Sequence, residues 1–97
     1  MNYDEFIEHV EAHNTPPDGV SEPLQALWHA QKGDWDAAHG VAQDIENADG
    51  SWIHANLHRE EGDLGNARYW YNRAGCPESK LPVEEERAEL IRHFLDA

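Results

Sequence analysis

Two histidines four residues apart are the first feature of this 97-residue sequence that could do chemistry. His54 and His58 lie in the stretch WIHANLHREEGD, residues 52–63. On a helix, residues four apart share one face, so the two imidazoles would project side by side. A His-x-x-x-His pair supplies two nitrogen ligands at a spacing that suits a divalent metal ion. Whether the pair binds a metal depends on the elements that position it.

Glycine and proline divide the chain into six segments, each with the pattern of a helix. The breaks lie at PPDG (16–19), Gly33, DG (49–50), Gly62 and GCPESKLP (75–82). The predicted helices cover residues 3–13, 22–32, 35–47, 52–61, 64–74 and 83–96. No run alternates apolar and polar residues over six positions, so we expect an all-α fold without a sheet.

Polar residues before the segments predict where the helices begin. Asn2, with Glu5 three residues later, has the pattern of a capping box. The same capping role is expected for Ser21, Asp34, Ser51 and Asp63. Glycine tolerates the left-handed conformation that ends many helices, so the glycines that follow three of the segments are predicted to end them: Gly33, Gly62 and Gly75.

Residues 29–42 are similar to residues 58–71 at an offset of 29 positions. The offset pairs identical residues at His29 with His58, Gly33 with Gly62, Asp34 with Asp63, and Ala38 with Ala67. Each copy is predicted to be a helix, a very short turn at Gly-Asp, and a second helix. Such a short turn makes the two helices antiparallel, and small alanines let their backbones approach closely.

In these residues the chain resembles the tetratricopeptide-type (TPR-like) helical hairpin repeats. The resemblance rests on LWHAQKGDWDAAHGVA (27–42) and ANLHREEGDLGNARYWYNRAG (55–75), and it covers roughly residues 22–77. It implies one all-α domain over residues 1–97. Two hairpins, about 22–47 and 51–76, would stack as a six-helix right-handed solenoid closed by capping N- and C-terminal helices. The second unit also looks like runs in small, uncharacterised bacterial proteins.

The sequence departs from the TPR-like pattern in three ways. Its period is 29 residues, whereas about 34 is usual, and it has only two units. Histidine stands at His29 and His58, where the family places a core aromatic residue. These departures leave the superhelical pitch open and bring the histidines back into question.

The repeat suggests a larger histidine cluster. Parallel neighbouring helices lie roughly 8–10 Å apart, so the equivalent residues His29 and His58 could approach each other. The predicted metal site is therefore His29, His54 and His58, with His39 as a further ligand for zinc, nickel, copper or iron. A carboxylate ligand, or an acid that holds one of the rings, would come from Asp36, Glu60 or Glu61.

Other interpretations of the histidines stay open. His29 and His58 could replace a core tyrosine, stacking on tryptophan and hydrogen-bonding a carbonyl or an acid, because buried polar groups are usually satisfied. The cluster could also form a small-molecule or acid–base site. His9, His13 and His93 lie near helix ends, where a cation interacts favourably with the helix dipole, so we expect no ligand role for them.

The resemblance also implies a concave face lined by the first helix of each unit. The residues expected on it are Trp52, Asn56, Arg59, Glu60 and Leu27. Tryptophan and arginine are enriched in binding hot spots. The first functional hypothesis is therefore a non-enzymatic interaction module for a basic or extended protein or peptide segment. The second is a divalent-metal-binding protein or metalloenzyme.

The charge balance limits the partners. There are 20 Asp and Glu against 7 Lys and Arg, which gives a net charge of −13. Such a surface repels nucleic acid and anionic membranes and favours cations and basic proteins. It also raises a third hypothesis, an acidic nucleic-acid mimic that blocks a basic groove. A homodimer is compatible with each of these hypotheses.

Other sequence features exclude several classes of protein. The single cysteine, Cys76, excludes an internal disulfide and a four-cysteine zinc site. We expect a cytoplasmic protein, because the N-terminus lacks a signal-like apolar run and no segment approaches about 18 consecutive apolar residues. Neither a nucleophile constellation nor a phosphate-binding glycine loop is present, so no catalytic residue is predicted.

Overall fold

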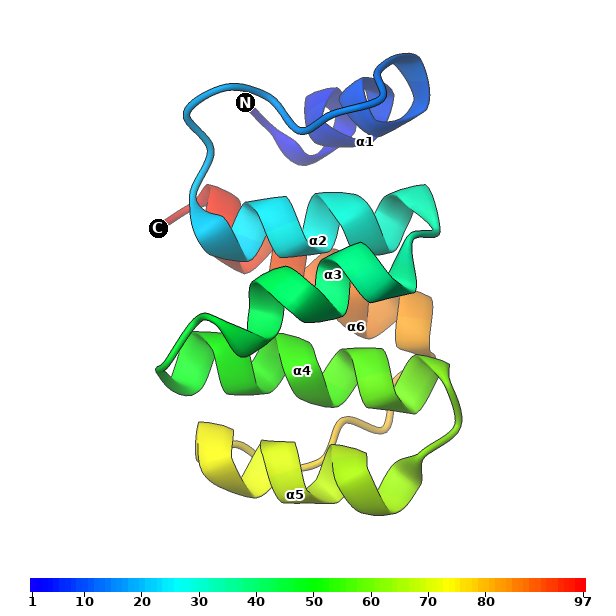
Figure 1. Cartoon of the computed structure of the whole chain (residues 1–97), viewed down its shortest axis with the longest axis vertical. Coiled ribbons are helices and arrows are strands. Elements are labelled where there is room, and N and C mark those ends of the chain that lie inside the picture. The colour runs from blue at the N-terminus through cyan, green and yellow to red at the C-terminus, as the bar shows by residue number, and fades with distance from the viewer.

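A computed structural model describes all residues 1–97 as six helices without a strand (Figure 1). The helices are α1 (Tyr3–Ala12), α2 (Glu22–Lys32), α3 (Trp35–Gln43), α4 (Ala48–Glu60), α5 (Leu64–Ala74) and α6 (Val83–Leu95). The prediction of six helices and no sheet is confirmed. None of the helices has the length and apolar character needed to cross a membrane.

Hydrogen bonds at the helix ends explain most of the boundaries. The Asn2 side chain accepts from the backbone N–H of Glu5, and the Glu5 carboxylate accepts from that of Asn2, so the capping box is confirmed. Ser21 is the N-cap residue of α2 as predicted, but its side chain makes no capping hydrogen bond. The predicted cap at Ser51 was wrong: α4 begins four residues before the predicted start, because Asn47 accepts from two backbone N–H groups in its first turn. Ser51 therefore lies inside α4.

The Gly-Asp turn has the same geometry in both copies of the repeat. Gly33 and Gly62 have φ angles of 90° and 82°, in the left-handed region that favours glycine. In each copy the aspartate backbone donates to the carbonyl five residues earlier at 2.9 Å. The carboxylates of Asp34 and Asp63 accept from the N–H three residues later at 3.1 and 3.2 Å. The paired turns join α2 to α3 and α4 to α5.

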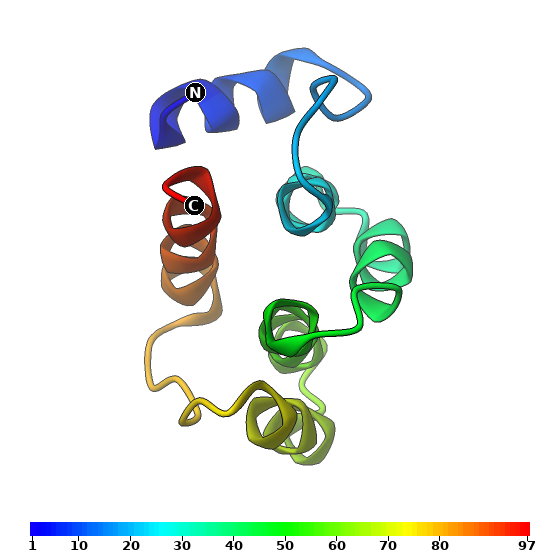
Figure 2. The same cartoon turned by 90° about the vertical axis from the view of Figure 1, so that its left-hand side faces the viewer.

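Helices α2, α3, α4 and α5 pack in chain order, and α6 returns along α2 and α4. Figure 2 shows helices α2 to α5 nearly end-on, with α6 on one side and α1 crossing above α2 and α6. Lys32 at the end of α2 holds the C-terminal end of α1 against α2, because its ammonium donates to the carbonyls of Val10 and His13, both at 2.7 Å. The right-handed TPR-like stack stays a prediction.

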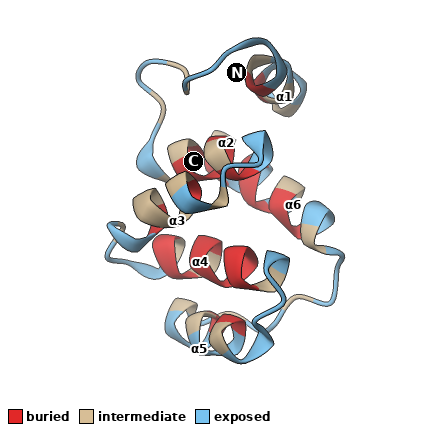
Figure 3. Cartoon of the chain, turned by 45° about the vertical axis from the view of Figure 1, so that its right-hand side comes forward, coloured by how far each residue is buried: buried red, intermediate tan, exposed pale blue.

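The main core lies where α1, α2, α4 and α6 meet. Its largest fully buried side chains are Phe6, Leu27, Trp28, Ile53, Leu57, Leu90 and Ile91. Figure 3 shows buried residues concentrated along α4 and on the neighbouring parts of α2 and α6. Because α4 is central, several of its polar side chains are removed from water, among them His54 and His58.

Candidate metal centre

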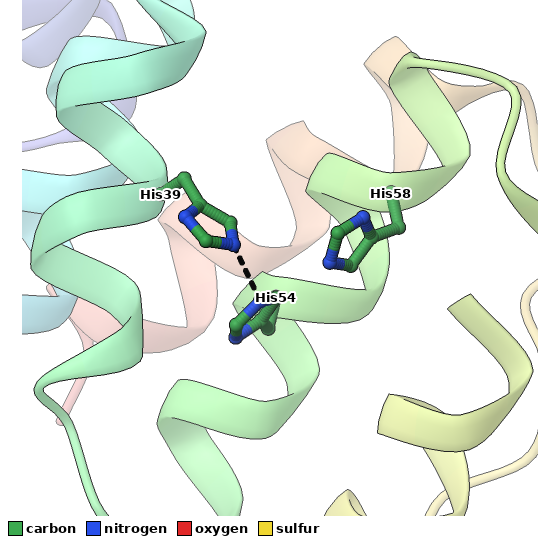
Figure 4. A group of neighbouring side chains, drawn as sticks. All are labelled: His39, His54 and His58. Carbon is green, nitrogen blue, oxygen red and sulfur yellow. Dashed lines mark hydrogen bonds between the residues drawn. The ribbon is translucent and has the colours of Figure 1, made fainter. Parts of the chain in front are cut away.

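Three histidines meet where α3 faces α4. His39 comes from α3, and His54 and His58 come from one face of α4 (Figure 4). One nitrogen from each ring lies within 4.8 Å of the others. The Nε2 atoms of His39 and His54 are 2.8 Å apart and share a hydrogen bond. His54 and His58 are only 4% and 5% exposed, so the cluster is largely shielded from water.

Aromatic rings frame the cluster on two sides. Trp35 of α3 stacks on His39 with centroids 4.7 Å apart, and Trp70 of α5 stacks on His54 at 3.8 Å. The indole N–H of Trp35 also donates to the carbonyl of Leu57 at 2.8 Å, which fastens α3 to α4 beside the histidines. Three consecutive helices therefore position the imidazoles.

A carboxylate orients the third imidazole. Nδ1 of His58 donates to Glu61 at 2.6 Å, just past the C-terminal end of α4. This contact leaves Nε2 as the nitrogen that can bind another group. Metal-binding histidines commonly present one nitrogen to the ion while the other donates to a carboxylate. Asp63 adds a second, exposed acid near His58 and Glu61.

The surroundings keep two of the imidazoles neutral at pH 7. Burial, together with the nearby His39 and His58, lowers the pKa of His54 to about 4. Burial and His58 also lower the pKa of His39, against the opposing effect of Glu61 and Asp36. A neutral imidazole has one N–H and one bare nitrogen. One ring of the His39–His54 pair must therefore donate, and the other must offer its lone pair.

The donor set matches the chemistry of a transition metal. Imidazole nitrogens bind zinc, copper, nickel and iron well. With Zn–N distances near 2.1 Å, two ligands of a tetrahedral ion lie about 3.4 Å apart. The Nε2 atoms of His39 and His54 would therefore separate by about half an ångström on binding zinc. Three protein ligands would leave a fourth position for water.

The structure corrects one member of the predicted site. His29 does not join the cluster, because its half-buried ring lies edge-on against Trp28, 5.4 Å between centroids. His39, predicted as the additional ligand, takes the third place with His54 and His58. Of the predicted carboxylates, Glu61 contacts a cluster histidine, while Glu60 pairs with Arg87 at 2.7 Å.

Helix α6 packs against α2 and α4 and covers part of the predicted concave face. The residues expected on it were Leu27, Trp52, Asn56, Arg59 and Glu60. Leu27 and Asn56 are 0% exposed, so neither can contact a partner on this structure. Side-chain nitrogens of Trp52, Asn56 and Arg59 all donate to Glu86 of α6, at 3.3, 2.8 and 2.8 Å. Trp52 and Arg59 stay partly exposed and Glu60 is exposed, so an interaction function for the protein stays a prediction.

Some of the residues around these sites were not singled out from the sequence. Glu86 lies four residues before the core residue Leu90, and this spacing indicates a charged side chain on the inner face of a helix. That signal could have identified Glu86. Nothing in the sequence indicates the stacking of Trp70 on His54, because the contact joins two helices whose relative rotation only the fold determines.

Comparisons with known proteins add no assignment. No protein-family model, curated protein or solved structure matches the chain. The TPR-like resemblance therefore stays a prediction, and the candidate metal centre is argued from its own geometry.

Proposed function

We propose that this protein binds one divalent transition-metal ion, with zinc as the first candidate, through His39, His54 and His58. The observation that carries the proposal is the proximity of three imidazoles between α3 and α4, two of them buried, with one nitrogen of each ring within 4.8 Å of the others. Nickel, copper and iron share the preference for imidazole and are the alternative ions.

The protonation state of the cluster supports this proposal. A metal binds a bare imidazole nitrogen, so protons compete with it. Because the pKa of His54 is lowered to about 4, this ring carries no extra proton to displace at pH 7. The net charge of −13 also favours the approach of a cation.

The arrangement around the cluster supports it as well. Glu61 holds Nδ1 of His58, and the tryptophans on His39 and His54 restrict the rotation of those rings. Ligands held in this way lose less freedom when they bind an ion. The chain's own residues thus supply three nitrogens, an orienting carboxylate and a shielded position.

Elemental analysis of the purified protein tests the proposal directly. Protein prepared without added metal or an affinity tag that binds metal should carry close to one equivalent of a transition metal. Removal by a chelator should lower the melting temperature, and zinc should restore it, because an ion that binds only the folded chain stabilises it. Metal-free protein whose melting temperature does not change with zinc, nickel, copper or iron would refute the proposal.

The internal repeat offers a matched control. His58→Gln removes a proposed ligand, whereas His29→Gln changes the equivalent histidine of the other copy, outside the cluster. The first substitution should abolish stoichiometric binding and the second should leave it intact. Equal loss of metal in both variants would contradict the assignment of the site.

A further inference from the structure

A second cavity, away from the histidines, collects positive charge in this acidic protein. It has a volume of about 330 Å³ and lies between α5, the end of α4 and the segment that leads to α6. Figure 2 shows that segment passing beside α5 on its way back to the other helices. Three of the seven lysines and arginines of the chain line the cavity: Arg59, Arg68 and Lys80.

The charge around this cavity is opposite to that of the whole molecule. Its lining holds three cations and a single carboxylate, Glu78, in a chain with a net charge of −13. Arg59 pairs with Glu86 behind it and Arg68 pairs with Glu78, so one excess positive charge, that of Lys80, remains at the cavity. The acidic surface elsewhere repels anions, which makes this cavity a favourable place for one to bind.

The cations in the lining have different roles. Arg59 is fixed, because its guanidinium donates to Glu86 at 2.8 Å and to the carbonyl of Leu81. Arg68 uses only Nε to reach Glu78, at 3.0 Å. Its two terminal amino groups, like the ammonium of Lys80, make no hydrogen bond within the protein. A guanidinium edge and an ammonium together suit a carboxylate.

The rest of the lining is partly apolar. Leu64, Ala67 and the Tyr71 ring line the same cavity, and Leu64 is 59% exposed. The Tyr71 hydroxyl turns inward and donates to Glu86 at 2.5 Å, so it is committed to the protein interior. Ala67 and Tyr71 are each only 2% exposed, so Leu64 is the main apolar side chain that a ligand would meet beside the cations.

We propose that this cavity binds a small organic carboxylate with an apolar body, about the size of benzoate. The carboxylate would lie against Arg68 and Lys80, and the apolar body against Leu64. This proposal is independent of the metal centre, since none of the three histidines lines the cavity.

Titration of the full-length protein with benzoate, followed by amide NMR, tests the proposal. Saturable shifts should appear at Leu64, Arg68 and Lys80. Acetate has the charge without the ring, and benzyl alcohol has the ring without the charge, so each should bind at least about tenfold more weakly. Absence of saturable shifts with benzoate, or equal binding of benzyl alcohol, would overturn the proposal.

Substitutions provide a second and sharper comparison. Arg68→Gln and Lys80→Gln should each weaken benzoate binding by about tenfold, because each removes a charged hydrogen-bond donor. Arg73→Gln is the matched control, since Arg73 lies on the same helix as Arg68 but outside this cavity. All three residues are exposed, so the variants should fold. If Arg73→Gln weakens binding as much as the other two, the effect is one of general charge and the assigned site is wrong.

Discussion

Glu61 determines which nitrogen of His58 is free. Its carboxylate accepts from Nδ1 at 2.6 Å, which fixes the ring and leaves Nε2 for the cluster. Glu61→Gln should therefore weaken zinc binding by about 10- to 100-fold without abolishing it, as is usual when the partner of a metal-binding histidine is removed. Competition with a chromophoric chelator measures this change. Glu85→Gln, at an exposed position on α6, is the control, and a similar loss there would contradict the role of Glu61.

His54 should make the metal-free protein sensitive to mild acid. Its pKa is lowered from 6.5 to about 4 in the folded chain, through burial and then through His39 and His58. Between these values the unfolded chain binds the proton more readily, so protonation favours unfolding. The free energy of unfolding of the metal-free protein should therefore fall by on the order of 3 kcal/mol as the pH drops from 6.5 to about 4.

Urea denaturation as a function of pH measures this effect. His54→Phe keeps an aromatic ring against Trp70 but cannot take up a proton, so its stability should fall less steeply between pH 6.5 and about 4. Equal slopes for the two proteins would show that His54 does not carry the acid sensitivity.

Glu86 is the most densely hydrogen-bonded side chain of the core. It is 1% exposed and accepts from the side chains of Tyr71, Trp52, Asn56 and Arg59. Glu86→Gln keeps the shape but leaves the largely shielded Arg59 without its counter-charge in the core, so we expect a loss of about 3 kcal/mol in the free energy of unfolding. Glu85→Gln should change stability by less than about 0.5 kcal/mol. Equal stabilities of the two variants by urea denaturation would contradict this account.

The sequence predicted much of the histidine cluster because the i, i+4 spacing of His54 and His58 is a local property of a helix. His39 was also named, but only as an additional ligand. The sequence could not show that His39, and not His29, would complete the cluster. Repeat equivalence relates positions within the two units, but it does not show which residue of the neighbouring helix faces His54 and His58. That relation depends on how α3 rotates against α4.

Among the helices, α4 makes an especially close contact at its start. A Cβ atom at Gly50 would lie 2.2 Å from the backbone oxygen of Ile45, so only glycine fits there. Gly50→Ala should destabilise the protein by about 1–3 kcal/mol through overpacking. Gly40→Ala, in the interior of α3 with no atom within 4 Å, should instead stabilise it by about 0.5–1 kcal/mol. Thermal unfolding checks both, and shifts of the same sign would contradict the close contact.

Helix positions were predictable where their signals are local. The Asn2 box and the two Gly-Asp turns depend on residues within one helical turn, and they are confirmed. The boundary between α3 and α4 was wrong because Asn47 was included in the preceding helix. In the structure, Asn47 caps α4, and the chain before it turns so that the backbone of Ile45 lies directly against Gly50.

The return of α6 is the feature of the whole molecule that the sequence did not indicate. A resemblance to hairpin repeats implies a terminal helix that closes one end of a stack. Here α6 instead lies along α2 and α4 and covers part of the face expected to bind a partner (Figure 1). Its placement depends on Glu86 and on core residues from distant parts of the chain, and no local pattern reports such contacts.

The net charge should make the stability of the molecule depend on salt. Its extents are 34 × 23 × 22 Å. Salt at about 10 mM screens charges only beyond roughly 30 Å, so the excess negative charges repel one another across nearly the whole molecule. Raising sodium chloride from about 10 mM to about 0.5 M should therefore raise the melting temperature of the metal-free protein. Circular dichroism measures this shift. A lower melting temperature in salt would mean that the ion pairs of Glu86 and Arg87 outweigh the general repulsion.

The candidate metal centre lies on the seam between the two hairpins, since His39 belongs to the first and His54 and His58 to the second. Neither hairpin alone holds more than two of the imidazoles. An ion held by all three would be released as soon as α3 and α4 part. Bound metal would then hold the two hairpins together, and the metal content of a preparation would report the fraction of molecules in which they are packed against each other.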